Sequence, residues 1–328
     1  MQYALGVDIG GTKTSVVLGS SQGKILASVV LPTQTGRNTR SGIKKLAEAL
    51  RLLKQKTGRG KRLLGVGVGI PGPMNPERGI VQRSPHLGGW EGFPLKSFLQ
   101  KQLQLPIMIN NDANVAALGE KVFGEGRRAR NFIYLTISTG IGGGVFANGE
   151  PVHGANFVGG EVGHMTIVPQ GELCKCGKRG CLEAYASGTG IARYVKAEVK
   201  RGRRSSVLRF VPKGGKLNAR ESGLAAKNGD RLALEAYRRA GYYLGVGIAN
   251  LLNLLNPELV VLGGGVLKSA PREFWQTMLK SCKREAWPQA YEKVRIVRSR
   301  LGDRVGDLGA LALVFSRCNI PCARSSVG

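Results

Sequence analysis

The sequence is poor in acidic side chains, and this shortage gives the chain a formal net charge of +28. Only 21 Asp and Glu stand against 49 Lys and Arg. A basic surface concentrates anions, so three explanations stay open: a solvated surface, a polyphosphate-like ligand, or nucleic acid. The basic segments show no regular interleaving of aromatic residues, which argues against nucleic acid as a partner. These segments are residues 37–62, 121–130, 196–220 and 293–304.

Several other features are missing. No apolar run approaches the ~18 residues of a membrane span, so we expect no membrane association. The first residues follow a strand pattern and lack the basic and apolar regions of a signal peptide. Six cysteines at uneven spacing suit a reducing compartment. We therefore expect a cytoplasmic protein in which Cys282, Cys318 and Cys322 are free thiols.

Glycine is abundant without a collagen period or a low-complexity tract. The 49 glycines are about 15% of the 328 residues, against a usual ~7%. They cluster beside strand-like runs, which indicates many close approaches of the backbone to a ligand. With 42% hydrophobic residues, a chain of this length should fold into more than one lobe.

Two strand–turn–strand segments carry the same kind of glycine turn. A strand over residues 2–9 contains Asp8 and leads through Gly10-Gly11-Thr12-Lys13 into a second strand. This hairpin lacks the Walker and dinucleotide spacings, but its backbone N–H groups could cradle phosphates, with Asp8 near Mg²⁺. Residues 132–149 repeat the arrangement around Thr139–Gly144. Plain hairpins remain the alternative, although the repetition favours two related lobes that share one nucleotide.

A third polar segment follows a predicted strand at residues 107–110. There Asn111 and Asp112 precede an alanine-rich helix. Asp112 could be the helix N-cap or a general base, because α/β folds place ligands at the carboxyl ends of strands. Asn111 could orient a hydroxyl group. We favour the catalytic interpretation.

Residues 159–183 contain a candidate metal site. Three thiols and an imidazole are a complete tetrahedral set for zinc, and two glycines between the last thiols permit the required turn. A disulfide or ordinary buried thiols are the alternatives. The proposed ligands are His164, Cys174, Cys176 and Cys181, flanked by the carboxylates of Glu161 and Glu183.

The remaining pattern predicts an α/β protein. We expect helices over residues 41–57, 94–103, 184–200, 230–255 and 307–316, and strands over 63–70, 259–262 and 294–298. Gly263-Gly264-Gly265 after the strand at 259–262 would let adenine and ribose approach, although a simple strand-to-helix turn is possible. Residues 201–222 and 317–328 receive no functional interpretation.

Together these segments resemble the ROK family of sugar kinases, repressors and uncharacterised reading frames, over about residues 3–316. The signature that carries the resemblance comprises Glu161, His164, Gly171, Cys174, Cys176, Gly177, Gly180, Cys181 and Glu183. It implies a two-lobed actin-like or hexokinase-like ATPase fold with an active-site cleft between the lobes. One lobe would comprise residues 1–113 and 307–328, and the larger lobe, with the zinc site, residues 114–306.

The resemblance also implies a role for each candidate residue. Asp112 would be the catalytic base and bind the sugar together with Asn111, Glu161, His164 and Glu183. His164 would also bind a structural zinc ion with the three cysteines. The phosphates and Mg²⁺ would be held by Asp8, Gly10, Gly11, Thr12, Lys13, Thr139 and Gly140, and the nucleoside by Gly264 and Gly265.

The implied activity is phosphoryl transfer from ATP to a hexose, with the 6-hydroxyl of glucose as the expected acceptor. Mannose, fructose or an N-acetylhexosamine as acceptor, and inorganic polyphosphate as donor, are alternatives. A DNA-binding regulator is a remote alternative. Repressors of the family carry a winged helix before the corresponding glycine turn, and here that turn begins at Asp8, so we expect no such module. The resemblance further implies a homodimer or homotetramer.

Overall fold

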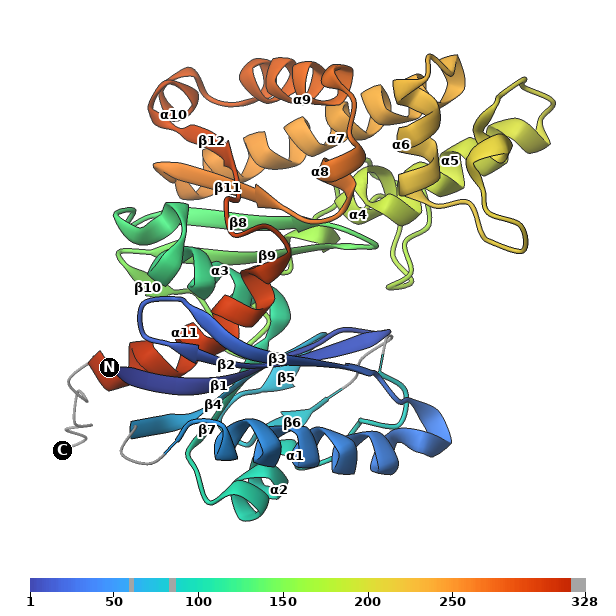
Figure 1. Cartoon of the computed structure of the whole chain (residues 1–328). Helices are drawn as coiled ribbons and strands as arrows, with labels where there is room; N and C mark the ends of the chain where they lie inside the picture. Colours follow the sequence, from blue (N-terminus) through green and yellow to red (C-terminus); the bar gives the residue numbers. More distant parts are fainter. Residues whose placement is uncertain (59–61, 83–86, 320–328) are drawn as a thin grey trace. The chain divides into compact units, whose positions relative to one another are not determined.

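The computed structural model describes residues 1–58, 62–82 and 87–319, which form two compact units (Figure 1). The first unit comprises residues 1–128, 151–159 and 300–328, and the second comprises 129–150 and 160–299. The first unit extends past residue 113 because helix α3 (Asp112–Phe123) packs on helix α11 (Val305–Asn319). Cys322 and the side chain of Cys318, both predicted as free thiols, lie outside the described part of the chain.

The first unit is built on a mixed five-stranded sheet with the order β3-β2-β1-β4-β7. Strands β1, β2 and β3 are antiparallel neighbours, whereas β4 and β7 run parallel to β1. The strands are β1 (Gln2–Ile9), β2 (Lys13–Ser20), β3 (Ile25–Pro32), β4 (Arg62–Ile70) and β7 (Ile107–Asn111), with a small pair β5 (Met74–Asn75) and β6 (Ile80–Val81). The carboxyl ends of β1 and β7 thus carry Asp8 and Asn111 on one sheet.

Helices cover both faces of this sheet. Helices α1 (Thr39–Gln55) and α2 (Leu95–Leu103) bury their apolar stripes on one face. Helix α11 lies on the other face, close to glycines of the strands. A Cβ at Gly67 of β4 would lie 1.8 Å from the carbonyl oxygen of Ala310, and one at Gly19 would lie 2.3 Å from Leu311. Part of the glycine excess therefore serves helix–sheet packing, not the approach of a ligand that the sequence analysis expects.

The second unit repeats the first sheet's topology. Its order is β10-β9-β8-β11-β12, with an antiparallel β8–β9 hairpin followed by parallel β11 and β12. Its strands are β8 (Phe132–Ile137), β9 (Ile141–Ala147), β10 (Glu150–Pro151), β11 (Leu259–Gly263) and β12 (Arg295–Arg298). The predicted repetition of one hairpin device in two related halves is confirmed.

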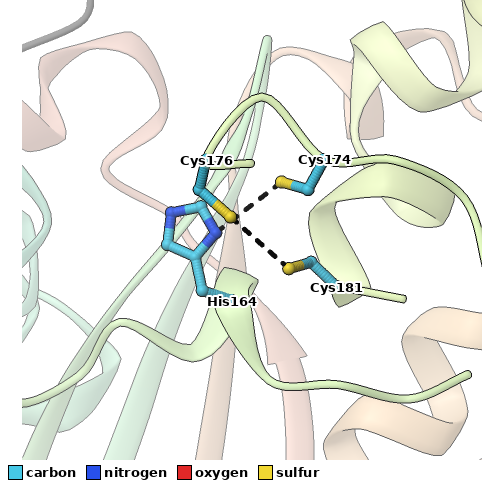
Figure 2. Close-up of side chains that lie close together, drawn as sticks. All are labelled: His164, Cys174, Cys176 and Cys181. Carbon is cyan, nitrogen blue, oxygen red and sulfur yellow. Dashed lines mark hydrogen bonds between the residues drawn. The ribbon is translucent and has the colours of Figure 1, made fainter. Parts of the chain in front are cut away.

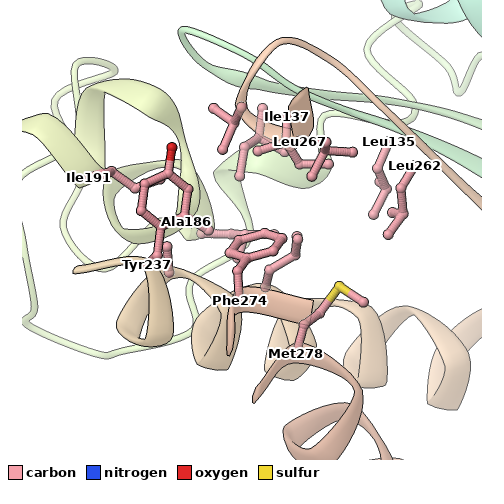
Figure 3. Close-up of a cluster of buried hydrophobic side chains, with 14 of the residues drawn as sticks. Leu135, Ile137, Ala186, Ile191, Tyr237, Leu262, Leu267, Phe274 and Met278 are labelled. Atoms are coloured by element: carbon pink, nitrogen blue, oxygen red, sulfur yellow. The ribbon is translucent and has the colours of Figure 1, made fainter. Parts of the chain in front are cut away.

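The core of the second unit lies between this sheet and its helices (Figure 3). Helices α7 (Arg231–Leu255) and α9 (Arg272–Glu285) pack together, and Tyr237 and Phe274 meet edge to face at 6.0 Å. Leu135 and Leu262 of the strands face this pair. The other helices are α4 (Leu182–Ala186), α5 (Gly188–Lys200), α6 (Ala219–Lys227), α8 (Val266–Ser269) and α10 (Pro288–Lys293).

The prediction of one continuous helix over residues 184–200 was wrong. The single helix expected over residues 184–200 is two helices, α4 and α5, separated at Ser187. The Ser187 hydroxyl accepts a hydrogen bond from the amide of Gly190 at 3.1 Å, and this N-cap starts a new helix. Among the described residues, no helix combines the length and apolar character needed to cross a membrane.

The contact at Gly67 gives a stability prediction. In the Gly67→Ala variant, the new methyl group would meet backbone that cannot rotate away, so helix α11 must shift. We expect a loss of about 1–3 kcal/mol in the free energy of unfolding, measured by urea denaturation. Gly88→Ala is the control, because a Cβ at that exposed turn meets nothing within 4 Å. Equal stability of the two variants would contradict the close packing of α11.

Candidate active site

The turn after Asp8 is tight and its tip is exposed. The amide of Gly10 donates to the carbonyl oxygen of Lys13 at 2.9 Å, which closes the β1–β2 turn. The hydroxyl group of Thr33, the residue after β3, donates a hydrogen bond to the carbonyl oxygen of Gly10 at 2.7 Å. Gly11, Thr12 and Lys13 are exposed, so their amides and the Lys13 ammonium are accessible to an anion.

Three carboxylates gather beneath this turn in the first unit. Burial, with the negative charges of Asp112 and Asp307, raises the pKa of Asp8 to about 7, although Lys13 lowers it. The Oδ1 atom of Asp307 is buried and has no hydrogen-bond partner among the described residues. Carboxylate oxygens that repel one another in a buried cluster suit Mg²⁺, which prefers oxygen ligands and relieves the repulsion. Asp307 was missed by the sequence analysis, because nothing near it in sequence marks it as a neighbour of Asp8.

The N-cap of helix α3 is Asn111. Its side-chain oxygen accepts hydrogen bonds from the amides of Ala113 at 2.9 Å and Asn114 at 3.4 Å. Its amide nitrogen donates to the carbonyl oxygen of Gly72 at 3.2 Å, so one of its two N–H groups remains for a ligand. Asp112 lies in the first helical turn and is half-buried, and its Oδ1 accepts a hydrogen bond from the amide of Ala113 at 2.8 Å.

The second glycine turn is tied to helix α5. The hydroxyl group of Thr189 donates to the carbonyl oxygen of Thr139 at 2.8 Å. The amide of Gly188 donates to the carbonyl oxygen of Ser138, also at 2.8 Å. A Cβ at Gly140 would lie 2.3 Å from the carboxylate of Glu183, so a larger residue there would displace that side chain. Gly264 has φ +102, and a Cβ there would lie 2.3 Å from the carbonyl oxygen of Ile137.

A pocket of about 990 Å³ opens beside this turn within the second unit. Thr139 and Gly265, predicted to contact phosphate and nucleoside, both line it, whereas Gly140 and Gly264 are not among its described lining residues. The walls also include Ala192 of α5 and the segment 216–220. That segment belongs to the stretch for which the sequence suggested no function, because nothing local shows that the chain folds back to Thr139.

The predicted metal ligands converge in the second unit (Figure 2). One ligand atom from each of His164, Cys174, Cys176 and Cys181 lies within 4.8 Å of the others. The sulfur atoms of Cys176 and Cys181 are 3.7 Å apart, and His164 Nδ1 is 3.8 Å from Cys174 Sγ. Tetrahedral zinc with Zn–S bonds of about 2.3 Å separates two sulfur atoms by about 3.8 Å. The set could therefore hold one tetrahedral ion, and 3.7 Å is too long for a disulfide of about 2.05 Å.

The loop that presents these thiols depends on its glycines and on burial. Gly177 and Gly180 have φ +90 and +82, and a Cβ at Gly180 would lie 1.9 Å from the carbonyl oxygen of Val168. Burial raises the pKa of the Cys174 thiol to about 12. A bound cation would reverse this effect, because thiols that bind a metal do so as thiolates.

The polar side chains around the metal set have defined partners. Glu183 Oε2 accepts a hydrogen bond from the amide of Ile141 at 2.9 Å, and its Oε1 is 3.7 Å from Cys174 Sγ. His164 turns Nδ1 toward the thiols and leaves Nε2 4.0 Å from Glu161 Oε2. Burial raises the pKa of Glu161, with Glu183 raising it and His164 lowering it. Glu161, His164 and Glu183 are thus brought together, as the sequence predicted.

Arg239 of helix α7 contacts side chains around the loop that carries the thiols. Its guanidinium lies 4.8 Å from the ring centre of Tyr185 and 4.7 Å from that of Tyr194. It is also 3.6 Å from the carboxylate of Glu172, whose amide donates to the Tyr185 hydroxyl group at 2.7 Å. Together these contacts hold Glu172, two residues before the metal-ligand candidate Cys174, in a defined position.

Two sheets of one topology, each with a glycine turn after its first strand, define the fold of the actin-like and hexokinase-like ATPases. Within that class the chain belongs to the ROK family, whose model matches residues 4–317.

Individual relatives extend over nearly the whole chain. A glucokinase from Halalkalibacterium halodurans is 38% identical, over 97% of this chain and 96% of its own. A xylose repressor from Caldicellulosiruptor bescii is 31% identical over 95% of this chain, which spans 78% of the repressor. The crystal structure of a ROK hexokinase from Thermus thermophilus has a TM-score of 0.82 at 34% identity, over 97% and 99% of the two chains. A ROK family glucokinase from Streptomyces griseus, solved with glucose and AMPPNP, has a TM-score of 0.80 at 29% identity, over 96% and 99%.

The raised pKa of Asp8 predicts a pH dependence of stability. Between about pH 4 and pH 7, the native protein keeps a proton that the unfolded chain has lost, so its free energy of unfolding should fall as the pH rises. Asp8→Asn should flatten this fall, measured by urea denaturation without Mg²⁺ or nucleotide. Asp303→Asn, which removes an exposed carboxylate of the same unit, is the control. Parallel curves for Asp8→Asn and the unmodified protein would contradict the prediction.

Proposed function

We propose that this protein is a hexose kinase that transfers the γ-phosphoryl group of ATP to the 6-hydroxyl of glucose. The observation that carries the proposal is the Asp112 carboxylate. It follows β7 directly, at the start of helix α3 whose N-cap is Asn111, and it lies near enough to Asp8 to raise the pKa of Asp8. The full-length likeness to glucokinases and ROK hexokinases supports the same activity.

Asp112 is proposed as the general base. It would accept the proton of the glucose 6-hydroxyl as that oxygen attacks the γ-phosphorus, a role typically worth ~10²–10⁴-fold in rate. Asn111 would orient the same hydroxyl group through its remaining N–H. Positioning and charge stabilisation would supply the rest of the acceleration.

The second unit would supply the other sugar contacts. Glu161 and Glu183 would accept hydrogen bonds from sugar hydroxyl groups, and charge-assisted bonds of this kind are strong. His164, held through Nδ1, would present Nε2–H as a donor 4.0 Å from the Glu161 carboxylate. Donor and acceptor at that separation could bind the same hydroxyl group from two sides.

The two glycine turns would bind the donor. Backbone amides of Gly11–Lys13 and Thr139–Gly140, with the Lys13 ammonium, would hold the phosphates, and Gly265 would lie against the nucleoside. Asp8 would hold Mg²⁺ directly or through water, and Asp307 lies close enough to assist. Mg²⁺ would neutralise charge on the phosphates during transfer.

Replacement of the base tests this mechanism. Asp112→Asn should lower kcat for glucose phosphorylation by about 10²–10⁴-fold. Glucose affinity, measured by calorimetry, should change little, because the amide can still hydrogen-bond to the hydroxyl group. Asp303→Asn is the matched control and should retain full activity. A kcat for Asp112→Asn close to that of the control would remove Asp112 as the base.

A structural zinc ion is proposed at the four converging ligands. Elemental analysis should find about one zinc per chain. Cys176→Ser should lose zinc and lower the thermal midpoint, because structural zinc contributes folding free energy outright. The Cys176 side chain is exposed, so lost core packing cannot explain the effect. Cys282→Ser, at a buried thiol outside the set, should retain zinc, and a zinc-free native protein would overturn the proposal.

A further inference from the structure

The guanidinium group of Arg193, on helix α5, contacts two separate segments of the second unit at once. Its Nη2 donates a hydrogen bond to the carbonyl oxygen of Ala184 in helix α4 at 2.7 Å. Its Nη1 donates to the carbonyl oxygen of Leu173, in the loop that carries the thiols, at 2.5 Å. Nη2 also lies 3.5 Å from the carboxylate of Glu172 in the same loop. One side chain therefore ties this loop to helix α4.

The two carbonyl groups stand next to residues of the proposed sugar and metal sites. Leu173 directly precedes the metal-ligand candidate Cys174, and Ala184 directly follows the proposed sugar ligand Glu183. Helix α4 has only five residues, and so short a helix is not stable without tertiary contacts. The position of the Glu183 backbone therefore depends on contacts such as those of Arg193.

The hydrogen bonds to the two carbonyl groups require the shape of a guanidinium. Arginine presents several N–H groups in a rigid planar fork, whereas a lysine ammonium is a compact point charge. The ion pair with Glu172 matters less, because that carboxylate is 45% exposed and exposed ion pairs contribute little. Lysine at position 193 would keep the charge and lose the simultaneous contact with the loop and helix α4.

The same side chain also lines the pocket beside Thr139, in which the proposed donor would bind. Arg193 is 39% exposed, so its positive charge is accessible to an anion in that pocket. Lys196 lies nearly one turn further along helix α5 and lines the same pocket. The charge of Arg193 thus faces the donor pocket, while its hydrogen bonds hold segments of the acceptor site.

We propose that Arg193 is a positioning residue for the sugar, an inference that rests on the proposed kinase function. It acts through the backbone of Ala184 and Leu173, and it holds Glu183 where a sugar hydroxyl group can reach its carboxylate. Its positive charge is a separate contribution, made to the phosphates of the donor. The two contributions can be separated by substitution.

The test is glucose phosphorylation with ATP and Mg²⁺, with the two KM values measured separately. Arg193→Lys should raise the KM for glucose by about tenfold, because the loop and helix α4 are no longer held together. Its KM for ATP should stay unchanged, because the charge in the pocket is kept. Lys196→Gln should do the reverse, with a KM for ATP raised by about threefold and an unchanged KM for glucose. Arg238→Lys, the same change at an exposed side chain of helix α7, should leave both values unchanged.

Each result for Arg193→Lys supports or overturns the inference. An unchanged KM for glucose overturns it, and so does an equal rise in the two KM values. A chain that does not fold, or a lower kcat with both KM values unchanged, would assign Arg193 to stability and also overturn it. Calorimetric titration with glucose, without nucleotide, should show the same tenfold loss of affinity. If the unmodified protein binds glucose but does not phosphorylate it, the kinase function fails, and this titration still tests Arg193.

Discussion

The acceptor side of the proposed site would depend on a cation bound among three thiols and the His164 ring. Without one, burial holds the pKa of Cys174 near 12, and a carboxylate oxygen 3.7 Å from its sulfur opposes ionisation further. With a cation present, the three thiolates and the His164 ring would bind one ion, and the loop that carries them would be held in place. The His164 ring is then fixed through Nδ1, so its Nε2 faces Glu161. Glu183 connects the same centre to the amide of Ile141, directly after the second glycine turn.

Close approach of backbone to backbone is the second constraint, and it explains residues that look functional in the sequence. Gly67 and Gly309 allow helix α11 to lie against β4 and α3. Gly140 belongs to the predicted phosphate turn and Gly264 to the predicted nucleoside motif. Each also lies so close to other atoms of this chain that a Cβ would clash with them. A glycine beside a strand therefore does not by itself indicate a ligand, because only spacing with polar neighbours separates the two roles.

The sequence predicted the parts of the site whose chemistry is local. The metal ligands, both turns and Asp112 are marked by side-chain type and spacing within a few residues, and the duplicated hairpin follows from strand and turn patterns. It did not predict Asp307 or the segment 216–220, because their neighbours lie far away in sequence. The break at Ser187 was missed because a serine inside a helical pattern does not show which way its hydroxyl group points.

The scarcity of acidic residues has a consequence beyond net charge. Several of the 21 carboxylates accept hydrogen bonds from a backbone N–H or a basic side chain, as at Asp230, Glu183 and Glu235. A carboxylate inside the pocket beside Thr139 would repel the phosphates that the turn is built to hold. Seven of the 49 basic side chains and no carboxylate line the described pocket next to Thr139, so the electrostatic potential of that pocket favours a bound anion.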